Sequence, residues 1–321
     1  MKIEKLNSGA TRRTTGRDIN EFLADLLGDR FRRYRDAWNK AGPNAIPAFP
    51  VHIDLEFVDR CNQSCVFCAR NKIMHPDIPY SVNTGGKMDE DIIDKVIEQT
   101  TMHGLYSINI AWGEPLLYKN IFEIIKRFST SGVVDLRLVT NGLLLGKFID
   151  EVFESRLVNL YVSIDAFSDE TYSILRGKGY QEVVENLLTF IEEKRYRKSF
   201  LPIIRVSFVE TDENRHEMEM FKVFWTDKVD IVDIQILTEF NKREYEDSKN
   251  KKWSCIEPFR RLSIIANGDI LPCCAFPGKE LIIGNISDMT IKEAWNSEKM
   301  KFIRENLLDD KEPICLICQG C

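Results

Sequence analysis

The chain has 321 residues, of which 44% are hydrophobic and 29% charged, and its formal net charge is −6 at pH 7. This length suffices for one large or two ordinary domains with a buried core. The acidic balance excludes nucleic acid as the expected partner. No apolar run reaches the roughly eighteen residues of a membrane span, and the N-terminus lacks the apolar core of a signal peptide. We therefore expect a cytoplasmic protein with no membrane partner.

Nine cysteines are unevenly distributed along the chain. Three lie between Cys61 and Cys68, and the other six lie between Cys255 and Cys321. Because the cytosol keeps thiols reduced, two such groups favour metal ligation over disulfides.

The first 47 residues are predicted to form an N-terminal helical extension. Apolar residues recur near helical spacing from Asp18 to Lys40, which indicates an amphipathic helix. Gly42 and Pro43, with prolines at 47 and 50, then mark a linker.

Strand and helix patterns alternate over residues 48–240, which predicts an α/β domain with six β/α units, a partial TIM-like barrel. The strand candidates are Val51–Phe57, Tyr106–Ala111, Val134–Thr140, Val158–Ile164, Ile203–Phe208 and Ile231–Leu237. The helical spans are about 89–103, 119–131, 146–154, 180–195 and 213–225.

These strands alternate apolar and polar residues, although parallel strands covered on both faces are usually apolar throughout. Polar side chains are costly to bury dry, so a polar inner wall predicts a wet or ligand-filled lumen. For any one of these residues, a satisfied hydrogen bond at a strand end is the competing interpretation. The predicted polar set is His52, Asp54, Glu56, Asn109, Arg137, Ser163, Asp165, Arg205, Ser207, Asp233 and Gln235.

The first cysteine group lies on one short segment, where Cys61, Cys65 and Cys68 are spaced by four and three residues. Three soft thiolates at this spacing can occupy three corners of a [4Fe-4S] cube and leave the fourth iron open to a small molecule. A structural zinc loop is the alternative, although zinc usually takes paired cysteines and a fourth ligand.

This Cx3Cx2C segment, with Phe67 before its last cysteine, resembles the signature of the radical S-adenosylmethionine (SAM) superfamily. The resemblance implies that the open iron binds SAM and that the reduced cluster cleaves SAM to methionine and a 5′-deoxyadenosyl radical. It also implies an electron donor such as flavodoxin or ferredoxin.

Later segments continue the resemblance over residues 51 to about 237. Gly113, Glu114 and Pro115 resemble the family's Gly-Gly-Glu-Pro motif, which holds the SAM amino group, but Trp112 replaces the first glycine. Asn141 and Ser163 lie at what resemble the family's third and fourth strand ends. The resemblance places Ser163 near the SAM ribose or carboxylate.

Residues 241–321 are predicted to form a second, smaller domain after a charged linker. Cys255 and Cys273 flank a strand, an Asn-Gly turn and a second strand, and Cys315 and Cys318 follow near the end. This order resembles the twitch, or SPASM-like, domain of radical SAM enzymes. It implies one auxiliary [4Fe-4S] cluster on these four cysteines.

Three further residues are candidates for catalysis. Cys274 and Cys321 are not needed for the four-cysteine cluster. They are either ordinary buried residues, with Cys321 as an alternative cluster ligand, or thiols that donate a hydrogen atom. Arg205 is expected at the mouth of the fifth strand, where it could hold a substrate hydroxyl. Its alternative is a structural ion pair with Asp165 or Asp233.

The leading functional hypothesis is a radical SAM oxidoreductase or epimerase that acts on a C–H of a sugar, nucleotide sugar or aminocyclitol. The polar inner wall favours such a small polar substrate. A radical SAM peptide maturase is the runner-up, although the extension lacks predicted strands for binding a leader peptide. The non-enzymatic alternative is an iron–sulfur electron carrier.

Overall fold

The computed structural model describes residues 2–5, 11–14, 18–68, 71, 86–237, 255–274 and 281–307. The strands are β1 Lys2–Lys5, β2 Thr11–Thr14, β3 His52–Leu55, β4 Ser107–Ile110, β5 Asp135–Thr140, β6 Asn159–Ser163, β7 Ile203–Glu210, β8 Ile231–Ile236, β9 Arg261–Ile264, β10 Asp269–Leu271 and β11 Gly284–Asn285. The helices are α1 Ile19–Leu27, α2 Asp29–Lys40, α3 Glu90–His103, α4 Ile121–Thr130, α5 Ile149–Glu154, α6 Asp169–Leu175, α7 Tyr180–Tyr196, α8 Met218–Thr226, α9 Ile291–Trp295 and α10 Glu298–Asn306.

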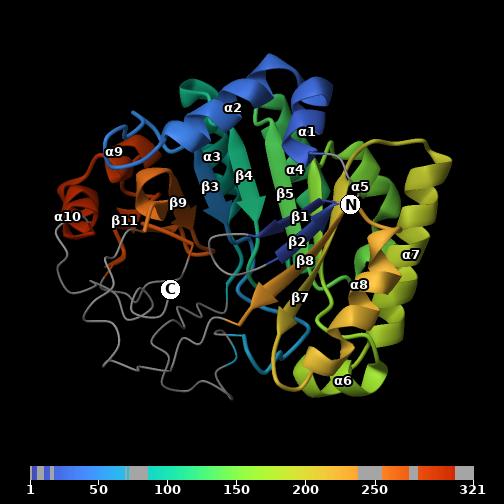
Figure 1. Cartoon of the computed structure of the whole chain (residues 1–321). Helices are drawn as coiled ribbons and strands as arrows, with labels where there is room; N and C mark the ends of the chain where they lie inside the picture. The colour runs from blue at the N-terminus through green and yellow to red at the C-terminus, as the bar shows by residue number, and fades with distance from the viewer. Residues whose placement is uncertain are drawn as a thin grey trace.

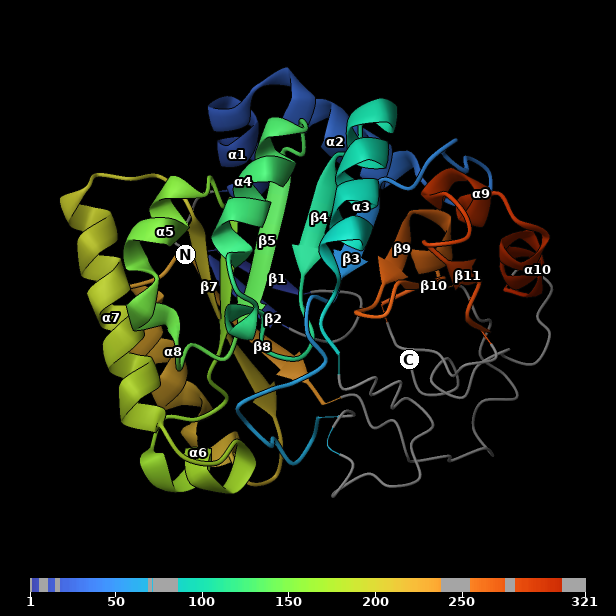
Figure 2. The ribbon, with the colours of Figure 1, turned by 180° about the vertical axis from the view of Figure 1, so that it is seen from behind.

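Strands β3 to β8 are parallel neighbours in chain order, and helices cover the outer face of the curved sheet (Figures 1 and 2). The described sheet is open, with β1 at one edge and β11 at the other. The outward residues of the strands pack against α3, α4, α7 and α8 in one apolar core. The predicted partial barrel of six β/α units is therefore confirmed.

Two helices, not one, lie across the amino-terminal end of the barrel (Figure 1). The predicted helix from Asp18 to Lys40 breaks at Gly28, whose φ of +75° only glycine adopts readily. Asp18 caps α1 by accepting from the backbone N–H of Asn20 at 2.8 Å. Phe31 and Tyr34 of α2 are fully buried against the strand starts.

The extension also contains strands that the sequence did not predict. β1 and β2 form an antiparallel hairpin, and β2 pairs antiparallel with β8 from Thr11–Ile234 to Thr14–Ile231. The hairpin therefore lengthens the barrel sheet at its last strand. The prediction of a purely helical extension is therefore wrong.

The C-terminal segment continues the same sheet at the opposite edge, where β9 pairs parallel with β3. The expected Asn-Gly hairpin is present as β9 and β10, and Gly268 takes φ +87° in its turn. Two helices follow, α9 and α10, and Ser297 caps the second by accepting from Met300 N. The domain division at residues 240 and 241 stays a prediction.

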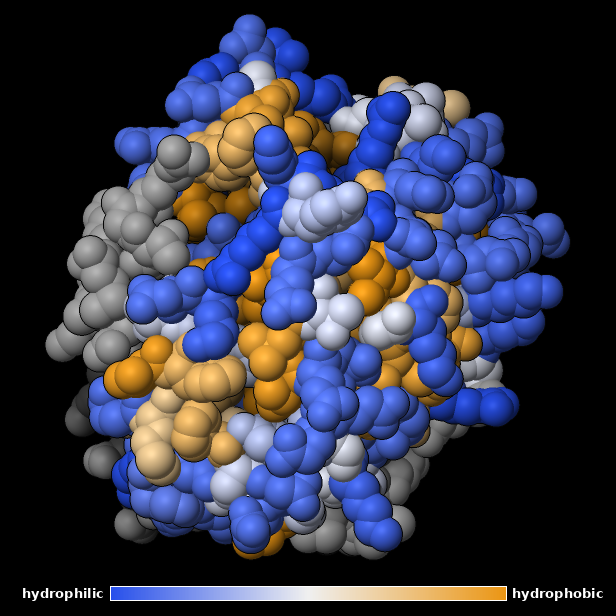
Figure 3. Space-filling model, turned by 90° about the vertical axis from the view of Figure 1, so that its right-hand side faces the viewer, coloured by the Kyte–Doolittle hydropathy of each residue, from blue (hydrophilic) through white to orange (hydrophobic). Residues whose placement is uncertain are grey.

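The outer surface over α7 and α8 is largely hydrophilic, with apolar patches between the charged side chains (Figure 3). Exposed apolar residues there include Tyr196 and Val223, as is ordinary for a protein surface. In the parts of the chain that the structure describes, no helix is long and apolar enough to cross a membrane.

Candidate active site

The cysteine loop lies beyond the carboxyl end of β3, at the end of the barrel opposite α2. Cys61 is exposed, and Cys65 and Cys68 are half-buried. The loop is tight, since Cys68 N donates to Cys65 O at 3.1 Å and Val66 N donates to Leu175 O at 2.9 Å. The thiols are thus presented at the mouth of the lumen.

Thiol chemistry at this loop fits a cluster better than a single ion. Burial raises the pKa of Cys61 and raises that of Cys65 to about 11, so iron must offset the cost of forming thiolates. Within the described ranges, no three His, Cys, Asp or Glu side chains converge closely enough to hold one metal ion. A cube takes its thiolates on separate irons, so the zinc alternative fits less well.

Gly113 lies directly against the backbone that leads into the cysteine loop. A Cβ at this position would lie 2.2 Å from Val58 O and 2.6 Å from Arg60 O, and Gly113 also has φ +53°. Trp112 takes φ +64°, so the loop adopts a glycine-type conformation although the preceding glycine of the family motif is replaced.

Glu114 is almost fully buried and holds the ends of two strands together. Its carboxylate accepts from Leu116 N at 3.0 Å, Thr140 Oγ1 at 2.8 Å and Asn141 N at 2.8 Å. Burial raises its pKa, while these hydrogen bonds act in the opposite direction. No ion pair joins it to another described residue, so its charge is available to a cationic ligand.

Asn141 and Ser163 lie at neighbouring strand ends around the loop. Asn141 Nδ2 donates to Asn62 Oδ1 at 2.7 Å and lies 3.7 Å from Cys61 Sγ. Ser163 ends β6 and lies in register with Ser207. The structure therefore brings Asn141 to a cysteine and places Ser163 on the inner face nearby.

Arg176 was not predicted, yet it joins the cysteine loop to β6. Its Nη1 donates to Gln63 Oε1 at 3.0 Å, and its Nε donates to Asp165 Oδ2 at 2.6 Å. Its guanidinium also lies 5.9 Å from the centre of the Phe67 ring. The short helix α6 that ends beside Arg176 was missed as well. The local signals for it are Ser168, which caps it by accepting from Thr171 N, and the acidic residues of its first turn.

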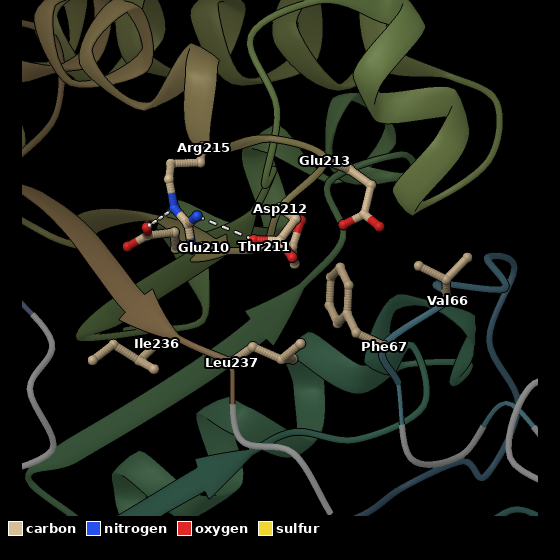
Figure 4. A pocket seen from close by; sticks show the side chains of 9 residues that line it. All are labelled: Val66, Phe67, Glu210, Thr211, Asp212, Glu213, Arg215, Ile236 and Leu237. Atoms are coloured by element: carbon tan, nitrogen blue, oxygen red, sulfur yellow. Dashed lines mark hydrogen bonds and ion pairs between the residues drawn. The ribbon is translucent and has the colours of Figure 1, made fainter. Parts of the chain in front are cut away.

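A cavity of about 590 Å³ opens at the mouth between the cysteine loop and the β7–α8 corner (Figure 4). The Phe67 side chain points into it, facing Glu213 and Leu237. Arg215 on its rim is paired with Glu210 at 2.6 Å and with Asp212 at 3.1 Å. The described rim is therefore acidic overall.

The inner wall below this cavity is polar, as expected, and its charges are paired. Asp54, Asp135 and Asp233 are each at most 1% exposed, while the arginines reach the lumen. The pKa values of Asp54 and Asp135 are held below their usual range, because neighbouring arginines outweigh the effect of burial. The pairs are Arg137 with Asp135, Arg205 with Asp233, and Arg261 with Asp54.

Arg205 shares the inner face with Ser207, but it is the third residue of β7 and does not lie at the mouth as expected. It forms the ion pair with Asp233, and its guanidinium lies 4.6 Å from the centre of the Tyr161 ring. Asp165, the other predicted partner, pairs with Arg176 instead. The strand continues two residues past its predicted end, to Glu210, so Arg205 lies further from the mouth than expected.

Three members of the second cysteine group, Cys255, Cys273 and Cys274, lie among the described residues. Cys273 is buried, and its carbonyl accepts from Ser263 Oγ at 2.8 Å. Cys274 lies near Arg261 and Cys255, and burial raises its pKa to about 12. Cys315, Cys318 and Cys321 lie outside the described residues.

Two family models match the chain. The model described as the radical SAM superfamily matches residues 55–221, and the model of an iron–sulfur cluster-binding domain, SPASM, matches residues 255–321. Together they cover the barrel from Leu55 to Phe221, which leaves out β8, and both cysteine groups.

Curated relatives include proteins named GTP 3′,8-cyclase. A GTP 3′,8-cyclase of Lactiplantibacillus plantarum is 30% identical over 164 residues, which is 50% of this chain and 48% of that protein. The match to a GTP 3′,8-cyclase of Clostridium botulinum is 25% identical and covers 84% of this chain and 76% of that protein. The chain spans about half the length of the first curated relatives it matches.

Solved structures share the fold at low sequence identity. SuiB of Streptococcus suis bound to S-adenosylmethionine superimposes with a TM-score of 0.61 at 16% identity, over 91% of this chain and 76% of that chain. BtrN in complex with AdoMet and 2-DOIA gives 0.53 at 17% identity, over 84% and 92%. The cofactors are accordingly SAM and iron–sulfur clusters. This chain belongs to the radical SAM superfamily and carries an iron–sulfur SPASM domain at its C-terminal end.

Proposed function

We propose that this radical SAM enzyme is an oxidoreductase or epimerase of a small hydroxylated molecule, namely a sugar, nucleotide sugar or aminocyclitol. The observation that carries the proposal is the inner wall, where three arginines are each paired with a buried aspartate. The wall thus offers hydrogen-bond donors and acceptors with little net charge.

Such a wall suits hydroxyl groups, which both donate and accept hydrogen bonds. An apolar peptide side chain would leave these polar groups desolvated and unpaired, at a cost of about 1–3 kcal/mol each. Partly exposed Asn109 and Tyr161 add further polar atoms between the arginines. A polyol is therefore the occupant that satisfies this wall best.

The residues around the mouth fit the cofactor. Cys61, Cys65 and Cys68 would hold the SAM cluster, and Phe67, Asn141, Ser163 and the Gly113–Pro115 turn would contact SAM. Cys255, Cys273, Cys315 and Cys318 would hold the second cluster. When bound, the first cluster with SAM would supply a 5′-deoxyadenosyl radical by reductive cleavage. The second cluster would supply a one-electron acceptor.

Below the mouth, Arg205 would donate a hydrogen bond to the substrate hydroxyl. Its pairing with Asp233 fixes the guanidinium, so the hydroxyl oxygen is held in one orientation and its deprotonation becomes easier. If the outcome is epimerisation, Cys274 or Cys321 would return a hydrogen atom to the opposite face of the carbon.

A triphosphate substrate, as the name of the curated relatives indicates for those proteins, finds less support at the described rim. Glu210, Asp212 and Glu213 would repel phosphate groups, and Arg215 is already paired. This charge pattern favours the neutral or amino-bearing members of the proposed class over nucleotide sugars.

A peptide maturase is the second candidate, because one observation favours it. Strands β1 and β2 supply the extension with a sheet edge, on which an extended leader peptide could pair as a further strand. A structure of SuiB bound to its precursor peptide SuiA also shares the fold, with a TM-score of 0.58.

The test is a product assay with anaerobically reconstituted enzyme, SAM and a reductant in D2O. The panel contains aminocyclitols, sugars, GTP and unrelated peptides. Dehydrogenation should give a carbonyl product without carbon-bound deuterium, whereas epimerisation should install one deuterium at the reacting carbon. A product altered only on a peptide, or only on GTP, would contradict the proposal.

Arg205→Gln gives a matched variant, with Arg197→Gln on the outer end of α7 as its control. Arg205→Gln should lower product formation about tenfold or more while 5′-deoxyadenosine release without substrate continues. Equal product formation in both variants would remove Arg205 from the site.

A further inference from the structure

Three contacts from one short segment converge on the cysteine loop. Leu175 O at the end of α6 accepts from Val66 N at 2.9 Å, and Tyr172 of α6 is hydrogen-bonded to Gln63. Arg176 then donates to Gln63 Oε1 at 3.0 Å. The loop between Cys61 and Cys68 is therefore attached to α6 at both Gln63 and Val66.

The guanidinium of Arg176 is itself held rigidly. Asp165 Oδ2 accepts from Arg176 Nε at 2.6 Å and lies 2.5 Å from Arg176 Nη2. The other carboxylate oxygen, Asp165 Oδ1, accepts from Val209 N at 2.7 Å. Asn214 Nδ2 donates to the Asp165 carbonyl at 2.9 Å. The charge thus has a fixed position relative to β6 and β7.

This fixed charge faces the loop. Gln63 Oε1, which accepts from Arg176, lies 4.0 Å from Cys65 Sγ, and the Arg176 side chain is only 8% exposed. A thiolate at Cys65, as a cluster ligand would be, attracts the Arg176 guanidinium. A partly desolvated charge is screened far less than one at the surface.

We propose that Arg176 is a positioning residue of the cysteine loop, which anchors the loop through Gln63 and favours the reduced state of a cluster bound there. Reduction adds one negative charge, and a nearby fixed cation stabilises that added charge. The proposal concerns the reductive step and does not depend on which substrate the enzyme takes.

The experiment uses the reconstituted full-length chain and three variants, Arg176→Gln, Arg176→Lys and Asp165→Asn. Asn tolerates the φ of +62° at position 165, so that variant keeps the backbone and removes the negative charge. The control is Arg197→Gln, which removes an arginine at the opposite end of α7. The readouts are the midpoint potential of the EPR signal that changes when SAM is added, and the rate of iron loss to a chelator.

Arg176→Gln should shift the midpoint potential to more negative values and speed iron loss several-fold relative to the control. Arg176→Lys should restore the potential but not the retention of iron, because an ammonium cannot reproduce the forked contacts to Asp165 and Gln63. Asp165→Asn should shift the potential in the opposite direction.

An unchanged potential in Arg176→Gln would overturn the proposal, as would shifts of the same sign in Arg176→Gln and Asp165→Asn. If Arg176→Gln fails to retain a cluster, the potentials of Arg176→Lys and Asp165→Asn decide. A lysine variant that matches wild type, with a more positive potential in Asp165→Asn, supports the proposal, and any other pair of results overturns it.

Discussion

At the carboxyl-terminal end of the barrel, Glu114 is held by two backbone N–H groups and a hydroxyl, whereas at the amino-terminal end Asp135 is held by side chains. Asp135 accepts from Asn159 Nδ2 at 2.7 Å, Arg137 Nε at 2.9 Å and Ser107 Oγ at 3.3 Å. Both carboxylates are at most 1% exposed. The pKa of Glu114 is raised by burial, and that of Asp135 is lowered by Arg137 in spite of burial.

The difference separates a binding end from a closing end. Amide hydrogen bonds fix a carboxylate without cancelling its charge, so the mouth retains charge for a cationic group such as the SAM amine. Ion pairs leave little net charge, so the end covered by α2 offers hydrogen-bonding groups but no unpaired charge to a ligand. Substitutions at the two ends should therefore fail in different ways.

The largest effect is expected from removing the thiols at the mouth. The Cys61/Cys65/Cys68 triple-alanine variant should lose reductive SAM cleavage completely, because no other described residue replaces these ligands. About half of the roughly eight irons expected for two [4Fe-4S] clusters should remain. Release of 5′-deoxyadenosine by this variant, measured chromatographically, would contradict the assignment.

Gly113→Ala should be the next most damaging change at the mouth. Its Cβ would lie 2.2 Å from Val58 O, so the loop must shift, and a displacement of about 1 Å costs on the order of 100-fold in rate. Gly104→Ala is the matched control, since Gly104 has φ +70° but nothing closer than 3.8 Å to an added Cβ. Equal SAM-cleavage rates in the two variants would show that the close approach is unimportant.

Asp135→Ala should act on stability and not on SAM cleavage per folded molecule. Removing the carboxylate leaves half-buried Arg137 without its partner, at a cost of up to about 3–5 kcal/mol. Asp94→Ala removes one of the two carboxylates that pair with Arg127 at the surface and should cost no more than about 1 kcal/mol. Urea unfolding checks both values, and similar midpoints would count against a closing role for this end.

A smaller, pH-dependent effect is expected from His52. Burial lowers its pKa, while Asp54 acts in the opposite direction, so the folded chain keeps His52 neutral where the unfolded chain takes up a proton. The unfolded state therefore binds more protons below about pH 6.5, and the free energy of unfolding should fall as pH drops below that value. The slope from one such group is at most about 1.4 kcal/mol per pH unit.

His52→Gln should flatten that slope, and His216→Gln at an exposed position serves as the control. Urea unfolding at intervals from pH 7.5 to 5 measures it. The same slope in wild type and His52→Gln would contradict this prediction, because it would mean that His52 binds its proton equally well in the folded and the unfolded chain.

Local patterns in the sequence were sufficient for the barrel and the cysteine loop. The six parallel strands follow from apolar stretches of strand length that alternate with helical periodicity, because burial of one face imposes the period of the element. Two motifs are also local, since each is defined by residues a few positions apart. They are the cysteine segment Cys61, Cys65 and Cys68 and the Gly113–Pro115 turn. Such signals remain visible before folding.

Tertiary structure decided the contacts between segments that lie far apart in the chain. Arg176 reaches Gln63 across 113 positions, and β9 pairs with β3 across more than 200, so no local pattern marks either contact. The partner of Arg205 was likewise open between Asp165 and Asp233 until strand register brought Asp233 within reach. The physical reason is that periodicity reports which face of an element is buried, whereas partners depend on which elements lie side by side.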